Sequence, residues 1–141
     1  MTQTLEPLAA SRTLVVRYDG GERYEIGVRG HTIVADQPIN AGGADEAPTP
    51  VELFVASLAG CVAYYAGRYL TRHGLSRVGL SVAVDYRMAD PPTRVTDVRL
   101  TVGLPDKFPT ERRQALQAVV EHCTVHNSLI TPPTVRIDLA R

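Results

Sequence analysis

The sequence predicts a domain of mixed α and β structure, with elements in the order βββ–α–ββ–α(α)–β. Three features lead to this order: short β-branched runs separated by glycine turns, one long apolar helix after them, and two alternating runs after that helix. A chain of 141 residues with 44% hydrophobic residues can bury the core of a single domain. We expect a flexible tail over residues 1–11 and a single domain over residues 12–141.

The N-terminal part predicts a three-stranded meander. Its strands are expected over residues 12–18, 23–28 and 31–36, and glycine-containing turns separate them. Residues 37–47 follow without any periodicity, and long loops of this kind are often functional.

A long central helix is expected from Pro48 onward. Proline is tolerated in a first helical turn, because the N–H that it lacks would have no partner there. Apolar or small residues fill nearly every position from Val51 to Ala66, which is typical of a helix buried on all sides. We place its end near Gly74, since glycine readily adopts the left-handed conformation of a C-terminal cap.

Strands and shorter helices are expected in the remainder of the chain. They are strands over residues 78–86 and 95–104, a helix capped by Thr110, a short helix over residues 123–129, and a final strand over residues 135–139. The alternation of the second long strand slips between Val95 and Val98, which a β-bulge would explain.

Composition excludes several classes of function. The counts of acidic and basic residues are equal, 15 each, which argues against nucleic acid or an anionic membrane as a partner. Polar residues flank the central helix and leave no membrane-spanning length, so we expect a cytoplasmic protein. Two cysteines are too few for the disulfide framework of a secreted protein.

Cys61 and Cys123 are the candidate redox residues. Cys61 lies in the middle of the apolar helix, where a cysteine can also serve simply as a small buried hydrophobe. Cys123 lies where a helix ends or restarts, and amides at a helix start lower the pKa of a thiol. If the two sulfurs approach each other, one can attack an oxidant and the other can resolve the sulfenic acid.

Two motifs resemble the OsmC/Ohr family. They are Pro-Thr-Pro-Val-Glu-Leu-Phe-Val-Ala-Ser-Leu-Ala-Gly-Cys, ending at Cys61, and His-Cys-Thr-Val-His-Asn-Ser-Leu, which contains Cys123. With the loop that starts at Asp36, the resemblance spans roughly residues 12–139. It implies an α+β, OsmC-like fold in which two chains intertwine into a homodimer around their central helices.

The resemblance also implies an activity. The best-understood members of the family are thiol peroxidases that reduce organic hydroperoxides and are regenerated by dithiols, lipoylated proteins in particular. On this basis Cys61 is expected to attack the peroxide and Cys123 to form the disulfide with it, and no bound cofactor is expected. The alternative is a non-catalytic OsmC-like dimer that binds a small apolar ligand or senses redox state.

The family's activating glutamate is not matched directly. It follows the proline that opens the helix, and that position here is Val51, a difference that favours the non-catalytic alternative. Glu52 comes next, but nine residues of helix place it half a turn out of phase with Cys61. Contact between the Glu52 carboxylate and Cys61 would need a kinked helix start or a glutamate from the other subunit. Alternatively, Glu52 is simply an acidic residue in the first helical turn, where the helix dipole favours a negative charge.

Two arginines are candidates for the activating cation. Arg23 follows the glycine turn where one branch of the family places its arginine, whereas Arg29 lies at the next turn; each can also be a solvated turn residue.

An apolar wall that favours organic hydroperoxides over hydrogen peroxide is expected from these side chains: Phe54, Leu58 and Tyr65.

The histidines His122 and His126 flank Cys123, but three possible ligands without further clustered His or Cys predict no metal site.

Overall fold

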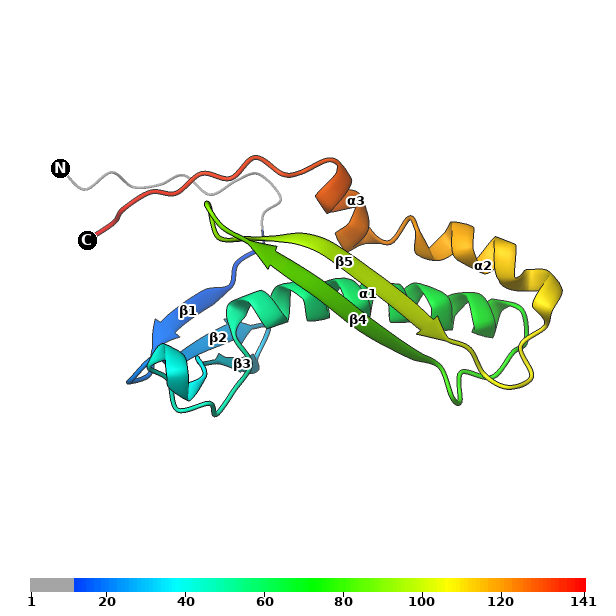
Figure 1. The fold of residues 1–141 in the computed structure, drawn as a ribbon, viewed down its shortest axis with the longest axis horizontal. Coiled ribbons are helices and arrows are strands. Elements are labelled where there is room, and N and C mark those ends of the chain that lie inside the picture. Colours follow the sequence, from blue (N-terminus) through cyan, green and yellow to red (C-terminus); the bar gives the residue numbers. More distant parts are fainter. Residues whose placement is uncertain (1–11) are drawn as a thin grey trace. The chain divides into compact units, whose positions relative to one another are not determined.

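The fold is described for residues 12–141 from a computed structural model (Figure 1). The tail expected over residues 1–11 lies outside the described residues. The chain divides into two compact units: one runs to Pro50 and includes residues 134–141, and the other comprises residues 51–133. The expectation of a single domain over residues 12–141 stays a prediction.

The first unit contains the predicted meander. Strands β1 (Val15–Tyr18), β2 (Tyr24–Val28) and β3 (His31–Ala35) form an antiparallel sheet in the order β1-β2-β3. Arg29 and Gly30 make the turn between β2 and β3 with φ angles of 47° and 80°, as a two-residue hairpin turn of the primed type requires.

The loop after β3 is built around Asp36, whose side chain is only 1% exposed. Its carboxylate accepts the backbone N–H groups of Gln37 at 2.7 Å and Glu46 at 3.0 Å. These bonds, with the amide of Ala44, lower the pKa of Asp36. Gly43 lies so close to the carbonyl of Gln37 that a Cβ there would collide with it. The loop is therefore a fixed structure, although the sequence predicted only a segment without periodicity.

The final strand predicted over residues 135–139 is wrong. Residues 134–141 form no strand, and Val135, Ile137 and Leu139 are strongly exposed, Leu139 to 98%. A strand exists only where its backbone groups pair with a neighbour, and no strand among residues 12–141 pairs with this segment.

The second unit is organised on helix α1 (Pro50–Arg72), which begins two residues after Pro48. Strands β4 (Ser81–Ala89) and β5 (Arg94–Gly103) form an antiparallel pair, in which Arg87 pairs with Asp97 but Met88 pairs with Val95. Thr96 is thus the extra residue of a β-bulge, which confirms the predicted slip.

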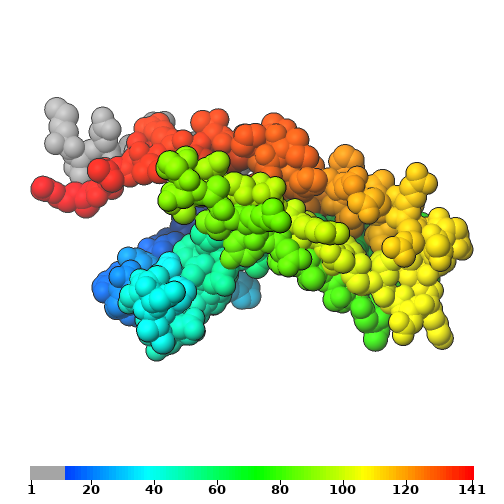
Figure 2. Space-filling view, viewed as in Figure 1, coloured from blue at the N-terminus to red at the C-terminus, as the bar shows by residue number. Residues whose placement is uncertain are grey.

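Three short helical segments complete this unit: η2 (Thr110–Arg112), α2 (Arg113–Val120) and α3 (Thr124–Ile130). Thr110 begins η2 and makes no side-chain cap, in contrast to its predicted role. Figure 2 shows the residues of these segments, yellow to orange, next to the green to yellow-green residues of β4 and β5.

Helix α1 is the core helix, but within one chain it is buried on one face rather than on all sides. Its buried residues recur at intervals of three or four and include Leu58, Val62, Ala66 and Tyr69. The opposite face exposes large side chains, such as Tyr64 at 55%. Strands and helices of the same unit cover a single stripe of the helix, which is why an apolar composition all round does not bring burial all round.

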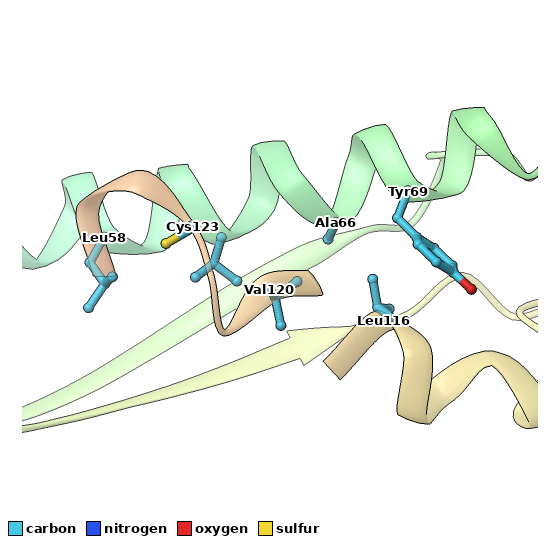
Figure 3. Close-up of a cluster of buried hydrophobic side chains, with 7 residues drawn as sticks. Leu58, Ala66, Tyr69, Leu116, Val120 and Cys123 are labelled. Carbon is cyan, nitrogen blue, oxygen red and sulfur yellow. The ribbon is translucent and has the colours of Figure 1, made fainter. Parts of the chain in front are cut away.

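The core of the second unit joins α1 to the later helices (Figure 3). Its buried members are Leu58, Val62, Ala66, Tyr69, Leu116, Val120 and Cys123. By length and composition alone α1 could cross a membrane, a test that the core helices of soluble proteins also meet. Its buried face belongs to this core.

Candidate redox site at the junction of α1 and α3

The two cysteines meet where α3 begins. Cys61 is partly exposed on α1, and Cys123 is fully buried as the N-cap residue of α3. Figure 3 shows Cys123 among the core side chains beside α1. Both are free thiols, Cys61 packs against the core cluster that contains Cys123, and its proximity raises the pKa of the Cys123 thiol. Two residues about 60 positions apart in sequence thus form one pair of neighbouring thiols.

The environment of Cys123 favours its protonated form. Burial raises the pKa of this thiol, and the neighbouring Cys61 raises it further. The backbone N–H groups of His126, at 3.4 Å from Sγ, and of Val125 act in the opposite direction without reversing the shift. The more exposed Cys61 is therefore the sulfur that a reagent in solution reaches first, with Cys123 behind it.

A second contact crosses the same junction. The hydroxyl of Tyr65 lies 2.9 Å from Oγ1 of Thr124. The ring of Tyr65 also makes an edge contact with Tyr64, with 5.6 Å between the ring centroids. Tyr65 was expected in a substrate wall, and the structure shows that its polar end has a partner on α3.

Glu52 and Val51 occupy the first turn of α1, and both are exposed. The helix is continuous from Pro50 to Arg72, so Glu52 precedes Cys61 by about 13 Å along the helix axis. No kink brings Glu52 toward Cys61 of the same chain. Its role in activating the thiolate stays a prediction that depends on a second subunit.

The two candidate arginines differ in how firmly they are held. Arg23 is ion-paired with Asp19 at 2.8 Å and with Glu46 at 2.7 Å, and these hydrogen bonds raise its pKa. Arg29 is exposed at the β2–β3 turn. Both arginines belong to the first unit, whereas the cysteines belong to the second.

Comparison with known families gives a match over residues 42–138 to the model of the OsmC-like proteins, which covers both cysteines. The chain belongs to the OsmC-like family.

Solved structures show the same fold. One is a protein of Psychrobacter arcticus assigned to the osmotic stress induced and detoxification response, with 24% identity, a TM-score of 0.77, and coverage of 84% of this chain and 88% of that one. Another is an organic hydroperoxide resistance protein OsmC of Legionella pneumophila, described as a predicted redox protein and regulator of sulfide bond formation. It has 20% identity, a TM-score of 0.56, and coverage of 83% and 88%. No curated protein matches the chain. The α+β, OsmC-like fold is thus confirmed.

This OsmC-like chain also contains a cavity of about 700 Å³ in its second unit. Its walls come from α1, β5, α2 and α3 and mix apolar side chains with polar ones, among them Arg113, Glu121 and His126. Leu58 lines this cavity, but Phe54 and Tyr65 do not. The three side chains expected to form one apolar wall are therefore not gathered around this space.

The ring of His126, beside Cys123, bonds to the backbone. The backbone N–H of His126 donates to Cys123 Sγ, and its ring Nδ1 lies 2.7 Å from the carbonyl oxygen of Glu121. Within residues 12–141, no group of three or more His, Cys, Asp or Glu side chains is placed to hold a metal ion.

Sequence reasoning found the cysteines but missed two features around them and in the loop. It did not pair Tyr65 with Thr124, and it gave Asp36 no role in ordering the loop. The sequence did hold a signal for the Tyr65–Thr124 contact, because Tyr65 follows Cys61 by one helical turn and Thr124 directly follows Cys123.

Proposed function

We propose that this protein is a thiol-dependent peroxidase that reduces organic hydroperoxides. The single observation that supports this most is the pair of neighbouring free thiols, Cys61 and Cys123, at the start of α3. Family membership and the redox description of one structural neighbour are consistent with the proposal. We place its activity in the cytoplasm, where free thiols persist.

The proposed reaction has two chemical steps before regeneration. The Cys61 thiolate attacks the distal peroxide oxygen, the O–O bond breaks, and the alkoxide takes up a proton to leave as an alcohol. Cys123 then attacks the Cys61 sulfenic acid, an S–S bond replaces the S–O bond, and hydroxide leaves as water with the thiol proton. A dithiol, free or on a lipoylated protein, reduces the disulfide by exchange and is itself oxidised.

Arg23 is the arginine that we favour for holding the thiolate. Asp19 and Glu46 fix its guanidinium, and a positioned cation is what a thiolate needs for a low pKa. We expect Arg23→Ala to slow the peroxide step by at least tenfold, while Arg29→Ala at the exposed turn stays within twofold of the parent. The rates are measured by stopped flow with cumene hydroperoxide; equal effects of the two variants would remove the preference for Arg23.

We further propose that the working form is a homodimer. On α1, the face away from the core exposes Tyr64 and carries Gly60, where an added Cβ would meet no side chain within 4 Å, and Phe54 at the flank of this face is also exposed. A second copy of the chain would cover this face and could supply Glu52 to the partner's Cys61.

The first test is mass spectrometry of the reduced protein after one equivalent of cumene hydroperoxide, followed by turnover with dihydrolipoamide. We expect a Cys61–Cys123 disulfide and many turnovers; the Cys61→Ser variant should lose both. The Cys123→Ser variant should retain one oxidation, to a sulfenic acid that dimedone captures. Unmodified thiols in the parent protein would reject the proposal.

The cavity, which Leu58, Val62 and Leu116 line among others, favours a second candidate function, the binding of a small ligand with an apolar part without turnover. Peroxide consumption separates the two functions, since an enzyme supplied with dithiol consumes a molar excess of hydroperoxide and a binder does not.

A further inference from the structure

We propose that Tyr65 and Thr124 are positioning residues that hold the start of α3 against α1, so that Cys123 can close a disulfide with Cys61. This inference deepens the proposed function and rests on it for the peroxide step. The positioning itself is a property of the folded chain and can be measured without peroxide.

The geometry links the hydroxyl contact to the thiol pair. Tyr65 follows Cys61 by four residues, which places both side chains on neighbouring positions of one face of α1. Thr124 follows Cys123 directly, at the first residue of α3. The 2.9 Å contact between the two hydroxyls therefore crosses the same junction as the neighbouring thiols, one helical turn further along α1.

Helix α3 is anchored in the core at its start, by Cys123 and Val125, and is mostly exposed over the remainder of its length. It has seven residues, and its end is open to solvent, with Leu129 at 41% and Ile130 at 66% exposure. His126 Nδ1 bonds to the carbonyl of Glu121, and Asn127 Nδ2 donates to the carbonyl of His122. These two bonds tie α3 to the end of α2 rather than to α1.

This arrangement affects how long the Cys61 sulfenic acid survives. If the start of α3 moves away from α1, Cys123 meets the sulfenic acid less often. A second peroxide molecule then has more time to oxidise it to the sulfinic acid, which dithiols do not reduce. The hydroxyl pair thus favours disulfide formation over irreversible oxidation.

The test is the equilibrium of the Cys61 and Cys123 thiols with reduced and oxidised glutathione, which gives the effective concentration of one thiol at the other. In that exchange the protein dithiol gains a disulfide as glutathione disulfide is reduced to two thiols. The proteins compared are the parent, Tyr65→Phe, Thr124→Val, Thr124→Ser, and the double variant Tyr65→Phe/Thr124→Val. Circular dichroism checks that each variant is folded.

We expect Tyr65→Phe and Thr124→Val each to lower the effective concentration about two- to tenfold, the range of one neutral hydrogen bond. The double variant should lose no more than the larger single loss, because both substitutions remove the same bond. Thr124→Ser keeps the hydroxyl and should remain near the parent. A merely structural role would change thermal stability without this pattern of rescue.

Effective concentrations of Tyr65→Phe and Thr124→Val equal to that of the parent would overturn the inference, as would fully additive losses. Dimedone capture after cumene hydroperoxide gives the functional counterpart: Thr124→Val should yield more trapped Cys61 sulfenic acid than Thr124→Ser. If peroxide leaves even the parent thiols unmodified, the proposed peroxidase fails, while the glutathione equilibrium still decides the role of the hydroxyl pair.

Discussion

Cys123 is fully buried at the start of α3, and burial raises the pKa of its thiol while two backbone N–H groups partly oppose the shift. In the proposed peroxidase, a resolving thiol of this kind would not compete for peroxide, since the thiolate is the nucleophile. The roles that we propose for the two cysteines thus agree with their exposure, because Cys61 is partly exposed and Cys123 is buried.

The raised pKa of Cys123 has a measurable consequence for stability. The folded protein keeps the thiol proton at a pH where the unfolded chain has already lost it. The free energy of unfolding should therefore be unaffected by this group below the ordinary thiol pKa and should fall as pH rises above it. We expect urea unfolding between pH 7 and 10 to show this fall in the Cys61→Ser protein and a smaller one in Cys61→Ser/Cys123→Ala. Identical pH dependences would show that Cys123 is not shifted upward.

At the scale of elements, the loop between β3 and α1 depends on one buried carboxylate. Asp36 accepts N–H groups from both ends of the loop, and Glu46, which it holds, carries one of the two carboxylates paired with Arg23. The position of the favoured arginine is thus coupled to a residue that makes no contact with a cysteine.

We expect Asp36→Asn to destabilise the protein at pH 7, because an amide nitrogen would face backbone donors. The lowered pKa of Asp36 gives stability that is present above the ordinary carboxyl pKa and is lost as pH falls through the lowered value. Urea unfolding from pH 7 to pH 3 should therefore show the difference between parent and variant shrinking with acid. Asp45→Asn in the same loop is the control, since asparagine tolerates the positive φ of 54° there. A difference that stays constant with pH would contradict this account.

Local patterns predicted most of the elements. The glycine turns of the meander and the slip at Val95 to Val98 were readable because turn chemistry and side-chain alternation act over a few residues. The strand over residues 135–139 failed because alternation shows only that a segment can pair, whereas a partner edge must come from elsewhere. All-round burial of α1 failed for a similar reason, since composition does not say how many neighbours one chain provides.

The candidate site was only partly predictable, because a sequence reveals distinctive residue types but not contacts between distant positions. Cysteine is rare and chemically distinctive, so Cys61 and Cys123 stood out in the sequence. Tyrosine and threonine are common surface residues, and a hydroxyl contact between positions 59 apart leaves no periodic trace.

At the scale of the whole molecule, large apolar side chains stay exposed on α1, such as Tyr64, and in residues 134–141, such as Ile137 and Leu139. Exposed large apolar groups on a central helix mark an interaction surface. A second copy of the chain could cover these exposed apolar side chains, which is why we propose the homodimer.

We expect Gly60→Val to weaken dimerisation at least tenfold while leaving the chain folded. A Cβ at Gly60 meets no atom within 4 Å apart from the local backbone of its own helix, so we expect the added side chain to obstruct a partner helix rather than the fold. Sedimentation equilibrium measures the dissociation constant. Gln114→Val, on the exposed side of α2, is the control for placing a valine on an exposed helix face. Undiminished association of Gly60→Val would place the interface elsewhere.

The separation of the neighbouring thiols in sequence carries a further consequence. A Cys61–Cys123 bond would close a loop of about 60 residues and, in the chain-entropy model, would stabilise the fold by about 4 kcal/mol through the unfolded state. Oxidised protein should then survive proteolysis that degrades reduced protein. Under oxidative stress the protein would accumulate in its most durable form, and when the stress ends, its own re-reduction would return it to ordinary turnover by cellular proteases.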